Sequence, residues 1–399
     1  MKCTGIVVEY NPFHNGHLYH IKETRRLINP DAIIAVMSPN WVQRGEPAII
    51  NKWARAEMAL KQGVDLVLEL PFIWATQSAK EFAQGSIAIL NATGLVKYQT
   101  FGSESADSDF LTQAAEILEK EPGNFKIELK KYLKEGYSYP KASANALNNL
   151  TNIDKELTPN DILGVEYIKS HLNLSTGITP MVIRRTGSNY HDKELTSNLA
   201  SATAIRNALK ENKIINNYVP ESTVEILAKH DKNFVFFKDL EKYLIYRLRT
   251  SSQKELSKYI GWEKGLEDRF KKSAIYNSDI ESVLNQTITK RYTRGRLNRY
   301  LIHLLVDLKR DKVNYFNKKG PAYLRVLGMN KRGQEALKKM KDTATLPVLT
   351  RPAKELRKLS PYVEACFREE VRATSVYNLL INKEGNEDFT KNAVITPFP

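Results

Sequence analysis

Short β-branched runs alternate with longer segments of helical spacing through the first half of the chain. Five runs predict strands: residues 4–8, 32–37, 64–70, 97–101 and 178–183. Three longer segments, with apolar side chains three and four positions apart, predict helices: residues 18–27, 52–62 and 79–90. Because strands that alternate with helices form parallel sheets, the predicted fold class is α/β, with a doubly wound, Rossmann-like parallel sheet.

The loops that follow the predicted strands are where a site is expected. In doubly wound sheets, ligands bind at the carboxyl ends of the strands. The loops after Val8, Met37, Leu70 and Phe101 therefore carry the candidate chemistry.

The strongest motif lies in the loop after the first strand. His14 and His17 are separated by Asn15 and Gly16, immediately before a predicted helix that begins at Leu18. The free N–H groups of a helix start favour a phosphate, and Gly16 lets the backbone approach a ligand closely. This arrangement suits attack on the α-phosphorus of a nucleotide, in which the protein aligns the reactants and stabilises charge on the phosphoryl oxygens. The alternative is a helix-capping or core pair of histidines.

The positive charge is concentrated in the second half of the chain. Residues 1–210 contain 23 Lys and Arg against 22 Asp and Glu, whereas residues 211–399 contain 37 against 23. An excess confined to one segment indicates a module that binds a polyanion, attached to a neutral module. We therefore predict a catalytic nucleotide-binding domain over residues 1–215 and a basic, mainly helical domain over residues 216–399. The alternative for the basic half is a lysine-rich solvated surface.

Several segments carry a family resemblance. Tyr10–His17 resembles the His-x-Gly-His signature of the HIGH superfamily of nucleotidyltransferases, and Ser201–Arg206 resembles its second signature, in the same order. The chain more closely resembles the bacterial tRNA(Met) cytidine acetate ligase family, and the segments that carry this resemblance are Val7–His17, Met37–Pro47, Phe101–Glu104, Pro159–Gly164 and Arg184–Gly187.

This resemblance implies an enzyme that works in two steps. ATP activates acetate as acetyl-adenylate, and the acetyl group then passes to the exocyclic amine of the wobble cytidine of elongator tRNA(Met), giving N4-acetylcytidine, AMP and pyrophosphate. The implied partners are ATP, acetate and tRNA, with Mg²⁺ carried by the phosphates of ATP. Two rival functions stay open: an adenylyltransferase that acts on a small phosphorylated metabolite, and an RNA-binding protein with an inactive nucleotide fold.

The residues and the resemblance together predict an ATP site built from several loops. His14 and His17 are the catalytic candidates, because they are expected to hydrogen-bond the phosphates as acetate attacks. Ser201, Thr203 and Arg206 are expected to hold the pyrophosphate end, and the alternative for Ser201 and Thr203 is a simple helix cap. The complete set predicted to bind ATP is Val7, Val8, Glu9, Tyr10, Asn11, Pro12, Phe13, His14, Asn15, Gly16, His17, His20, Gly102, Asn160, Arg185, Ser201, Thr203 and Arg206.

Three of these positions depend partly on the resemblance. Gly102 follows a strand at the carboxyl edge, where a missing side chain leaves room for an adenosine. Asn160 lies in a Pro-Asn-Asp turn, so it either caps the next helix or contacts the nucleotide, as the resemblance implies. Arg184 and Arg185 end a strand whose side chains alternate, and the resemblance selects Arg185 as the ligand contact.

The loop after the second strand is predicted to contact the second substrate. Asn40, Gln43 and Arg44 make this loop unusually polar. Arginine pairs with a carboxylate through two hydrogen bonds, and glutamine offers both a donor and an acceptor. The loop therefore suits the acetate carboxylate or the target base, and the alternative is an ordinary polar surface loop.

The basic half contains one dense cationic stretch over residues 290–300. Its Lys and Arg side chains are interleaved with two tyrosines, a pattern that suits phosphate contacts and base stacking. A second cluster begins at residue 331. The residues predicted to bind tRNA are Arg291, Arg294, Arg296, Arg299, Lys331 and Arg332.

Other protein classes lack support in the sequence. No apolar run reaches the roughly 20 residues that cross a bilayer, so a cytoplasmic location without membrane contact is expected. Cys3 and Cys366 are far apart and have no His cluster nearby, so neither a disulfide framework nor a zinc site is expected, and no protein metal site is predicted. Because DNA-reading motifs are absent, a folded RNA is expected as the polyanion rather than DNA.

Overall fold

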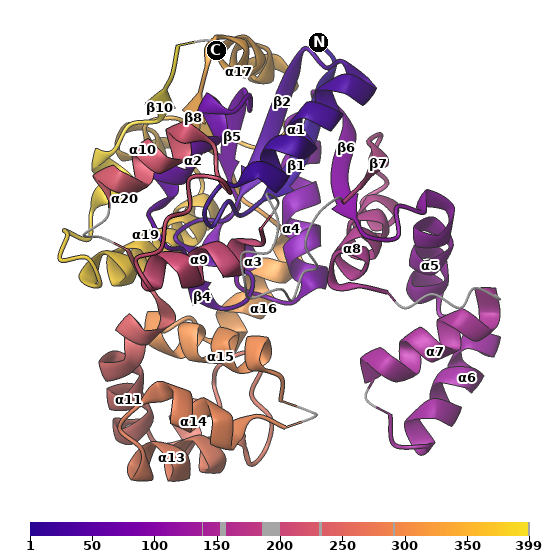
Figure 1. Cartoon of the computed structure of the whole chain (residues 1–399), viewed down its shortest axis with the longest axis vertical. Helices are drawn as coiled ribbons and strands as arrows, with labels where there is room; N and C mark the ends of the chain where they lie inside the picture. Colours follow the sequence, from indigo (N-terminus) through magenta and orange to yellow (C-terminus); the bar gives the residue numbers. More distant parts are fainter. Residues whose placement is uncertain (138, 152–156, 186–199, 231–233, 290–291, 398–399) are drawn as a thin grey trace.

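A computed structural model of the chain contains one large sheet (Figure 1). The structure describes residues 1–399 except 138, 152–156, 186–199, 231–233, 290–291 and 398–399. The strands of the sheet are β1 Cys3–Val8, β2 Ala32–Met37, β5 Leu66–Glu69, β6 Val96–Ser103, β7 Thr179–Arg184, β8 Leu324–Met329, β9 Val348–Leu349 and β10 Val394–Ile395. Their order is β10-β8-β5-β2-β1-β6-β7, and β9 pairs with β8 beside this path. A separate hairpin pairs β3 (Trp41–Val42) with β4 (Glu46–Pro47).

The five strands predicted from the first half form a continuous parallel stretch of this sheet. β5, β2, β1, β6 and β7 are parallel to their neighbours along this stretch, so the predicted α/β class is confirmed. The chain builds outward from β1 through β2 to β5 and then returns to add β6 on the other side of β1. Such a reversal of strand order is the place where doubly wound sheets bind ligands.

Helices cover both faces of the sheet, which explains the continuous apolar runs of its strands. One face is covered by α1 (Asn15–Ile28), α2 (Lys52–Lys61), α9 (Ala202–Lys210) and α10 (Glu221–Lys229); the other is covered by α3 (Phe72–Ala75), α4 (Ala79–Ala92) and α8 (Pro159–Asn173). Along β2, Ile33 and Met37 pack into the first of these cores, whereas Ile34 and Val36 pack into the second. Alternate side chains of one strand thus fill two cores.

The second half is mainly helical, as predicted, but it also contributes β8, β9 and β10 to the sheet. Besides α10, its described helices are η2 Phe237–Leu240, α11 Glu241–Thr250, α12 Gln253–Leu256, α13 Leu266–Tyr276, α14 Ile280–Thr287, α15 Arg294–Val306, α16 Arg310–Lys319, α17 Lys331–Thr343, α18 Pro352–Glu355, η3 Leu356–Lys358, α19 Pro361–Leu379 and α20 Glu387–Thr390. β8 lies antiparallel to β5, so the sheet is mixed but mostly parallel, and the antiparallel pairing at this edge was not predicted. The sheet extends across the predicted domain boundary at residue 215, and that boundary stays a prediction.

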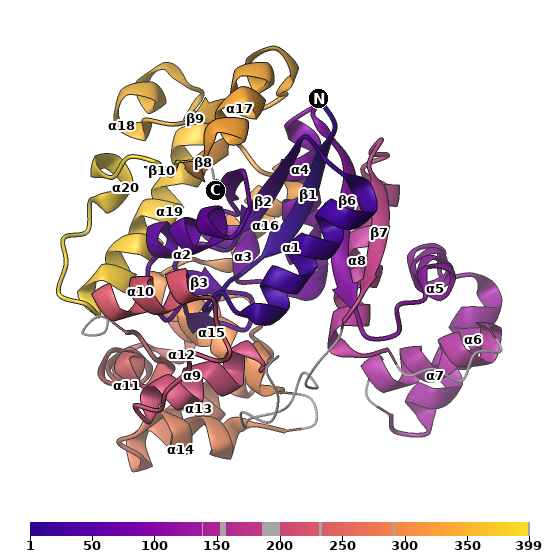
Figure 2. The same ribbon diagram turned by 45° about the horizontal axis from the view of Figure 1, so that its top comes forward.

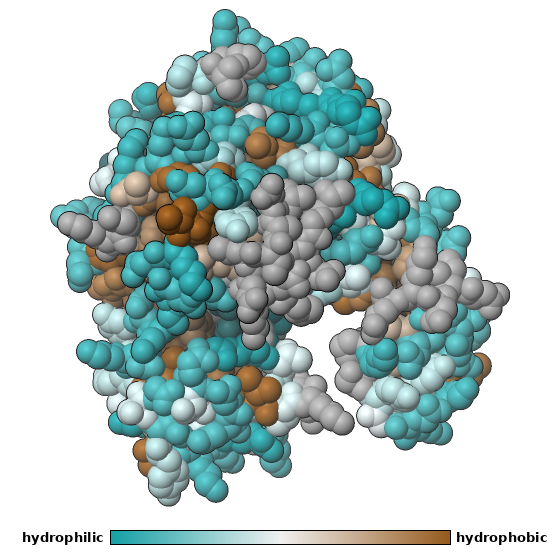
Figure 3. All heavy atoms as spheres, in the orientation of Figure 1, coloured by the Kyte–Doolittle hydropathy of each residue, from teal (hydrophilic) through white to brown (hydrophobic). Residues whose placement is uncertain are grey.

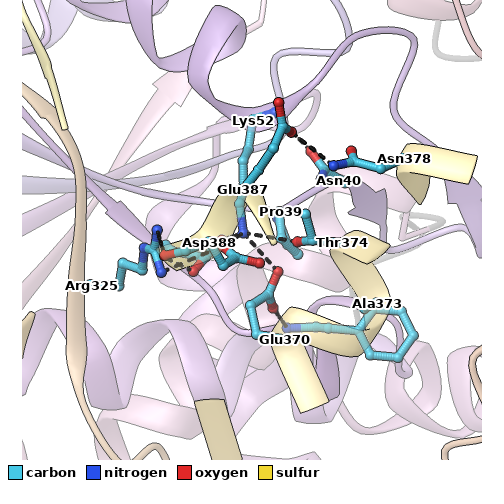
Figure 4. Close-up of polar contacts among 12 residues, drawn as sticks. Pro39, Asn40, Lys52, Arg325, Glu370, Ala373, Thr374, Asn378, Glu387 and Asp388 are labelled. Atoms are coloured by element: carbon cyan, nitrogen blue, oxygen red, sulfur yellow. Dashed lines mark hydrogen bonds and ion pairs between the residues drawn. The ribbon is translucent and has the colours of Figure 1, made fainter. Parts of the chain in front are cut away.

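A buried charge cluster joins the added edge of the sheet to the first half (Figure 4). Lys52 Nζ, at the start of α2, lies 2.5 Å from Glu69 Oε1, 3.0 Å from Glu370 Oε1 and 2.7 Å from Asp388 Oδ1, and all four side chains are fully buried. Arg325 of β8 is the second cation, 3.4 Å from Asp388. If all were ionised, these three carboxylates and two cations would carry one excess negative charge. Burial and the neighbouring Glu69 accordingly raise the pKa of Glu370 to about 8, against the opposing effect of Lys52.

Three further helices form a projecting arm: α5 Ser108–Lys120, α6 Gly123–Lys134 and α7 Tyr139–Thr151. Phe125, Leu129, Ala142 and Ala146 form a small separate core in this arm. Figures 1 and 2 show the arm on the β7 side of the sheet, away from α11, α13 and α14. Figure 3 shows these two groups of helices as separate lobes with open space between them.

Candidate active site

A pocket lies at the carboxyl ends of β1 and β6, where the strand order reverses. Most residues predicted to bind ATP line it: Val7, Val8, Glu9, Tyr10, Asn11, His14, His17, His20, Gly102, Asn160, Arg185, Ser201, Thr203 and Arg206. From the predicted substrate loop, Gln43 and Arg44 also line the pocket. The remaining predicted residues belong to the same loops but not to the lining: Pro12, Phe13, Asn15, Gly16 and Asn40.

His14 caps the start of α1 and His17 lies in its first turn, and both line the pocket. His14 Nδ1 accepts a hydrogen bond from Gly16 N at 3.1 Å, and His17 Nδ1 accepts one from His14 N at 3.2 Å. The two rings are stacked with their centroids 3.6 Å apart. The alternative prediction, that the two histidines cap the helix, is therefore confirmed: both side chains accept backbone N–H groups at the start of α1. Because a neutral imidazole that accepts through Nδ1 carries its proton on Nε2, each ring retains an Nε2–H donor.

The pocket environment keeps these imidazoles neutral at pH 7. Burial, together with the charges of Arg185 and Arg206, lowers the pKa of His14 to about 3. Burial also lowers the pKa of His17 well below its usual value, with His14 and Arg185 adding to the effect. The pKa of His20 falls to about 4 through burial and Arg185. The rings can therefore serve a phosphate as hydrogen-bond donors, while the arginines supply the positive charge.

The start of α9 meets the loop after β1 in the same pocket. Ser201 Oγ caps α9 by accepting a backbone N–H at 3.1 Å, which confirms the capping alternative for this residue. Arg206 Nη1 donates to Asn11 O at 2.9 Å, and its Nη2 donates to Thr203 Oγ1 at 3.3 Å and lies 3.6 Å from Glu46. The N-terminus of α9 and the guanidinium of Arg206 are thus fixed beside the loop after β1 that carries His14 and His17.

Gly102 and Arg185 lie against each other at the ends of β6 and β7. A Cβ atom at Gly102 would lie 2.9 Å from Arg185 Cγ, so the missing side chain makes room for this arginine. Arg185 Nε lies 3.2 Å from Glu104 Oε1, and Asn160 Nδ2 donates to the same carboxylate. Thr158 caps α8, so the capping alternative for Asn160 is wrong.

The predicted substrate loop divides into a buried support and a pocket-lining part. Asn40 is fully buried, and its Oδ1 accepts from Lys52 N at 2.8 Å, so it supports the loop from behind. Gln43 N donates to Glu9 Oε1 at 2.7 Å, while Gln43 O accepts from Arg299 Nη1 of α15 at 3.3 Å. The loop is therefore held between the end of β1 and a helix of the basic half.

The family model described as HIGH Nucleotidyl Transferase matches residues 1–392. The chain belongs to the HIGH nucleotidyl transferase family. It is 41% identical over 392 residues to the tRNA(Met) cytidine acetate ligase of Thermosipho africanus. The aligned region covers 96% of this chain and 93% of that relative. It is 42% identical over 383 residues to the ligase of the same name from Caldicellulosiruptor saccharolyticus, covering 95% and 94%. The family resemblance predicted from the motifs is confirmed.

Solved structures of Thermotoga maritima TmcAL resemble this chain over its whole length. The apo form is 36% identical, with a TM-score of 0.93 and all of both chains covered. A second form, bound with alpha-thio ATP, is also 36% identical, with a TM-score of 0.91 and the same coverage. In both cases the match includes the part of this chain that carries β8, β9 and β10.

Two parts of the pocket could not be found from the motifs alone. Leu163 and Tyr167 add to its apolar wall, and they lie three and seven positions after Asn160 on α8, a helical spacing that is their only sequence signal. Arg55 lies behind the pocket, where its Nη1 donates to Glu9 O at 2.6 Å and to Ser38 O at 3.1 Å. Contacts to backbone carbonyls leave no signal in the sequence of either partner.

The predicted tRNA-binding residues lie in three different settings. Arg294 and Arg296 are paired with Glu281 and Glu263, each at 2.6 Å. Arg299 contacts the substrate loop, whereas Arg291 lies outside the described residues. Lys331 and Arg332 begin α17, and Arg332 shares a surface hollow with Met1, at the end of the sheet opposite the pocket (Figure 1).

Neither a protein metal site nor a membrane span is found in the described part of the chain. Its side chains include no group of three or more His, Cys, Asp or Glu that could hold a metal ion. None of its helices is both long and apolar enough to cross a bilayer. Cys3 and Cys366 are buried free thiols, and burial raises the pKa of Cys3 to about 11.

Proposed function

We propose that this chain is a tRNA(Met) cytidine acetate ligase that uses ATP to activate acetate and then acetylates the wobble cytidine of elongator tRNA(Met). One observation carries the chemistry. Two neutral histidines at the start of α1 lie in one pocket with the start of α9, Arg185 and Arg206, at the carboxyl ends of β1 and β6. The relatives, similar over nearly the whole chain, support the choice of substrates.

The first step joins acetate to AMP. An acetate oxygen attacks the α-phosphorus of ATP, and pyrophosphate leaves from the opposite side. The Nε2–H groups of His14 and His17 donate to the phosphate oxygens, and Arg206 and Arg185 offset the growing negative charge. Arg44 and Gln43 suit the acetate carboxylate, since they reach the same pocket from the loop after β2.

The second step transfers the acetyl group to RNA. The exocyclic amine of cytidine attacks the carbonyl carbon of the mixed anhydride, and AMP leaves. No covalent enzyme intermediate is needed, because the anhydride is reactive once the amine is aligned with it. The net positive charge of residues 211–399 suits a tRNA phosphate backbone. The open space between the α5–α7 arm and the lobe of α11, α13 and α14 offers a path for RNA (Figure 3).

Mg²⁺ is proposed to arrive with ATP, held through phosphate oxygens and water. The described residues form no metal cage, so no step is assigned to a protein-bound metal. A cytoplasmic location is proposed because tRNA and ATP are both present there.

Acetate-dependent exchange of labelled pyrophosphate into ATP tests the first step. We expect exchange that requires the chain, Mg²⁺ and acetate and needs no tRNA. Exchange driven by a phosphorylated metabolite in place of acetate would instead support the rival adenylyltransferase. His17→Ala is the matched inactive control, because it removes one phosphate donor. Absence of exchange with acetate would contradict activation as a separate step.

A further inference from the structure

Glu9 was predicted to bind ATP, and it lines the pocket, but its carboxylate has no assigned role in the adenylation step proposed above. Among the described residues, the pocket is lined by two carboxylates, Glu9 and Glu46. Glu46 faces Arg206 at 3.6 Å, whereas no ion pair to Glu9 is present within 4.0 Å in the described part of the chain. Acetate enters the first step already deprotonated, so that step releases no proton to be accepted. The second step does, because an amine that becomes an amide must lose one.

The hydrogen bonds of Glu9 hold one of its oxygens and leave the other available. Oε1 accepts from Gln43 N at 2.7 Å and from Ser38 Oγ at 3.4 Å. Oε2 has no hydrogen-bond partner among the residues that the structure describes. The backbone carbonyl of Glu9 accepts from Arg55 Nη1 at 2.6 Å, so the residue is fixed at its main chain as well. A carboxylate held in this way keeps one oxygen in a defined position for a substrate.

The surroundings make this carboxylate more basic than an exposed one. Burial raises the pKa of Glu9 above its usual value, and the hydrogen bond from Gln43 and the charges of Arg44, Arg206 and Arg55 only partly oppose the rise. Tyr167, buried on α8, lines the same pocket, and the negative charge of Glu9 adds to the rise that burial causes in the pKa of this tyrosine. A base whose pKa lies nearer the working pH accepts a proton from a substrate more effectively.

We propose that Glu9 is the general base of acetyl transfer. As the bond between the cytidine N4 atom and the acetyl carbon forms, Oε2 of Glu9 accepts the proton that N4 loses. The bond between the acetyl carbon and the phosphate oxygen breaks, and that oxygen leaves with its electron pair as part of AMP. This assignment rests on the proposed function, since it requires an amine acceptor and an acetyl-adenylate in the same pocket.

The competing explanation is that Glu9 only positions the loop that carries Gln43. Two substitutions separate these roles. In Glu9→Gln, the amide oxygen can still accept from Gln43 N, but the side chain can no longer accept a proton at neutral pH. In Glu9→Asp, a base is retained on a shorter side chain.

The test measures the two steps separately on the full chain. Pyrophosphate exchange with acetate reports activation, and single-turnover transfer of labelled acetate from preformed adenylate to tRNA reports the second step. For Glu9→Gln we expect exchange within about threefold of the parent chain and transfer slowed about 100-fold or more. In the parent chain, the transfer rate should fall at acidic pH as Glu9 becomes protonated, and Glu9→Gln should lack this fall. Glu9→Asp should keep the fall in rate. Glu46→Gln, the matched change at the other pocket carboxylate, should keep it too.

Two results would overturn the assignment. Transfer by Glu9→Gln within threefold of the parent chain, with the acidic decline intact, would show that another group accepts the proton. Equal loss of exchange and transfer in a variant with unchanged thermal unfolding would show that Glu9 holds the pocket together instead. A parent chain without acetate-dependent exchange would count against the proposed function itself, so the two failures are distinguishable.

Discussion

Replacing Lys52 with methionine should destabilise the fold strongly. Lys52 Nζ contacts three carboxylates at 2.5, 2.7 and 3.0 Å, and its side chain and theirs are fully buried. Methionine fills a similar volume but leaves Glu69, Glu370 and Asp388 facing Arg325 alone. Removing one partner of a buried ion pair typically costs about 3–5 kcal/mol, and three affected partners place the expected loss near the upper end of that range.

The loss should depend on pH in a definite direction. Without Lys52, the pKa of Glu370, already about 8, rises further. At neutral pH this carboxyl group is therefore protonated in the folded state and ionised in the unfolded state, where its pKa is ordinary. Stability then falls as pH rises, and it recovers as pH is lowered from 8 towards 6. The variant should therefore be closer to the parent chain at pH 6 than at pH 8.

Urea unfolding followed by circular dichroism at both pH values measures this effect. Lys120→Met is the matched control, because Lys120 pairs with Glu116 at 3.5 Å on an exposed helix surface, and its loss should change stability by about 0.5 kcal/mol or less. A loss below about 1 kcal/mol for Lys52→Met, or a loss that grows on acidification, would refute this account of the cluster.

Three further changes address the site. His17→Ala should slow acetate-dependent pyrophosphate exchange about 100- to 1,000-fold while leaving tRNA affinity in a filter-binding assay unchanged, because one phosphate donor is lost far from the basic surface; an equal loss of tRNA affinity would contradict this separation. Gly102→Ala should raise the KM for ATP about five- to tenfold in the same exchange assay, since the new Cβ would lie 2.9 Å from Arg185 Cγ and displace it; an unchanged KM would mean that Arg185 does not contact ATP. Reversing Arg291 and Arg294 to Glu should weaken tRNA binding and lower the slope of log affinity against log salt by about 0.7–0.9 for each lost phosphate contact; an unchanged slope would place the RNA elsewhere.

The parallel core was predictable because its signal is local. The run at residues 32–37 became β2 with those bounds, since a strand covered on both faces is apolar throughout. β8 was missed although its six residues are all buried. Its run contains Arg325, and a charge within an apolar run argues against a buried strand. In the structure this charge meets Asp388 and Glu69, partners from distant parts of the chain that no local pattern reveals.

The site was predictable where a rule ties function to position. Ligands bind at the carboxyl ends of parallel strands, and this rule and the two signatures predicted that His14, His17 and Arg206 share one site. The structure places all three in one pocket. Which arginines of the basic half are buried was not predictable from the number of charges. Arg299 was expected on an RNA-binding surface, yet it contacts Gln43 O and burial lowers its pKa to about 10. Its assignment to tRNA stays a prediction, while its contact with the substrate loop is observed.

The most direct test of the proposed function is transfer of labelled acetate to tRNA. The chain is incubated with ATP, Mg²⁺, labelled acetate and elongator tRNA(Met), each component is omitted in turn, and the RNA is digested to nucleosides. We expect label in N4-acetylcytidine from the wobble position, only when ATP and the chain are both present. Label that appears without ATP, or tRNA that stays unlabelled while acetate-dependent pyrophosphate exchange proceeds, would contradict the assignment as a tRNA acetate ligase.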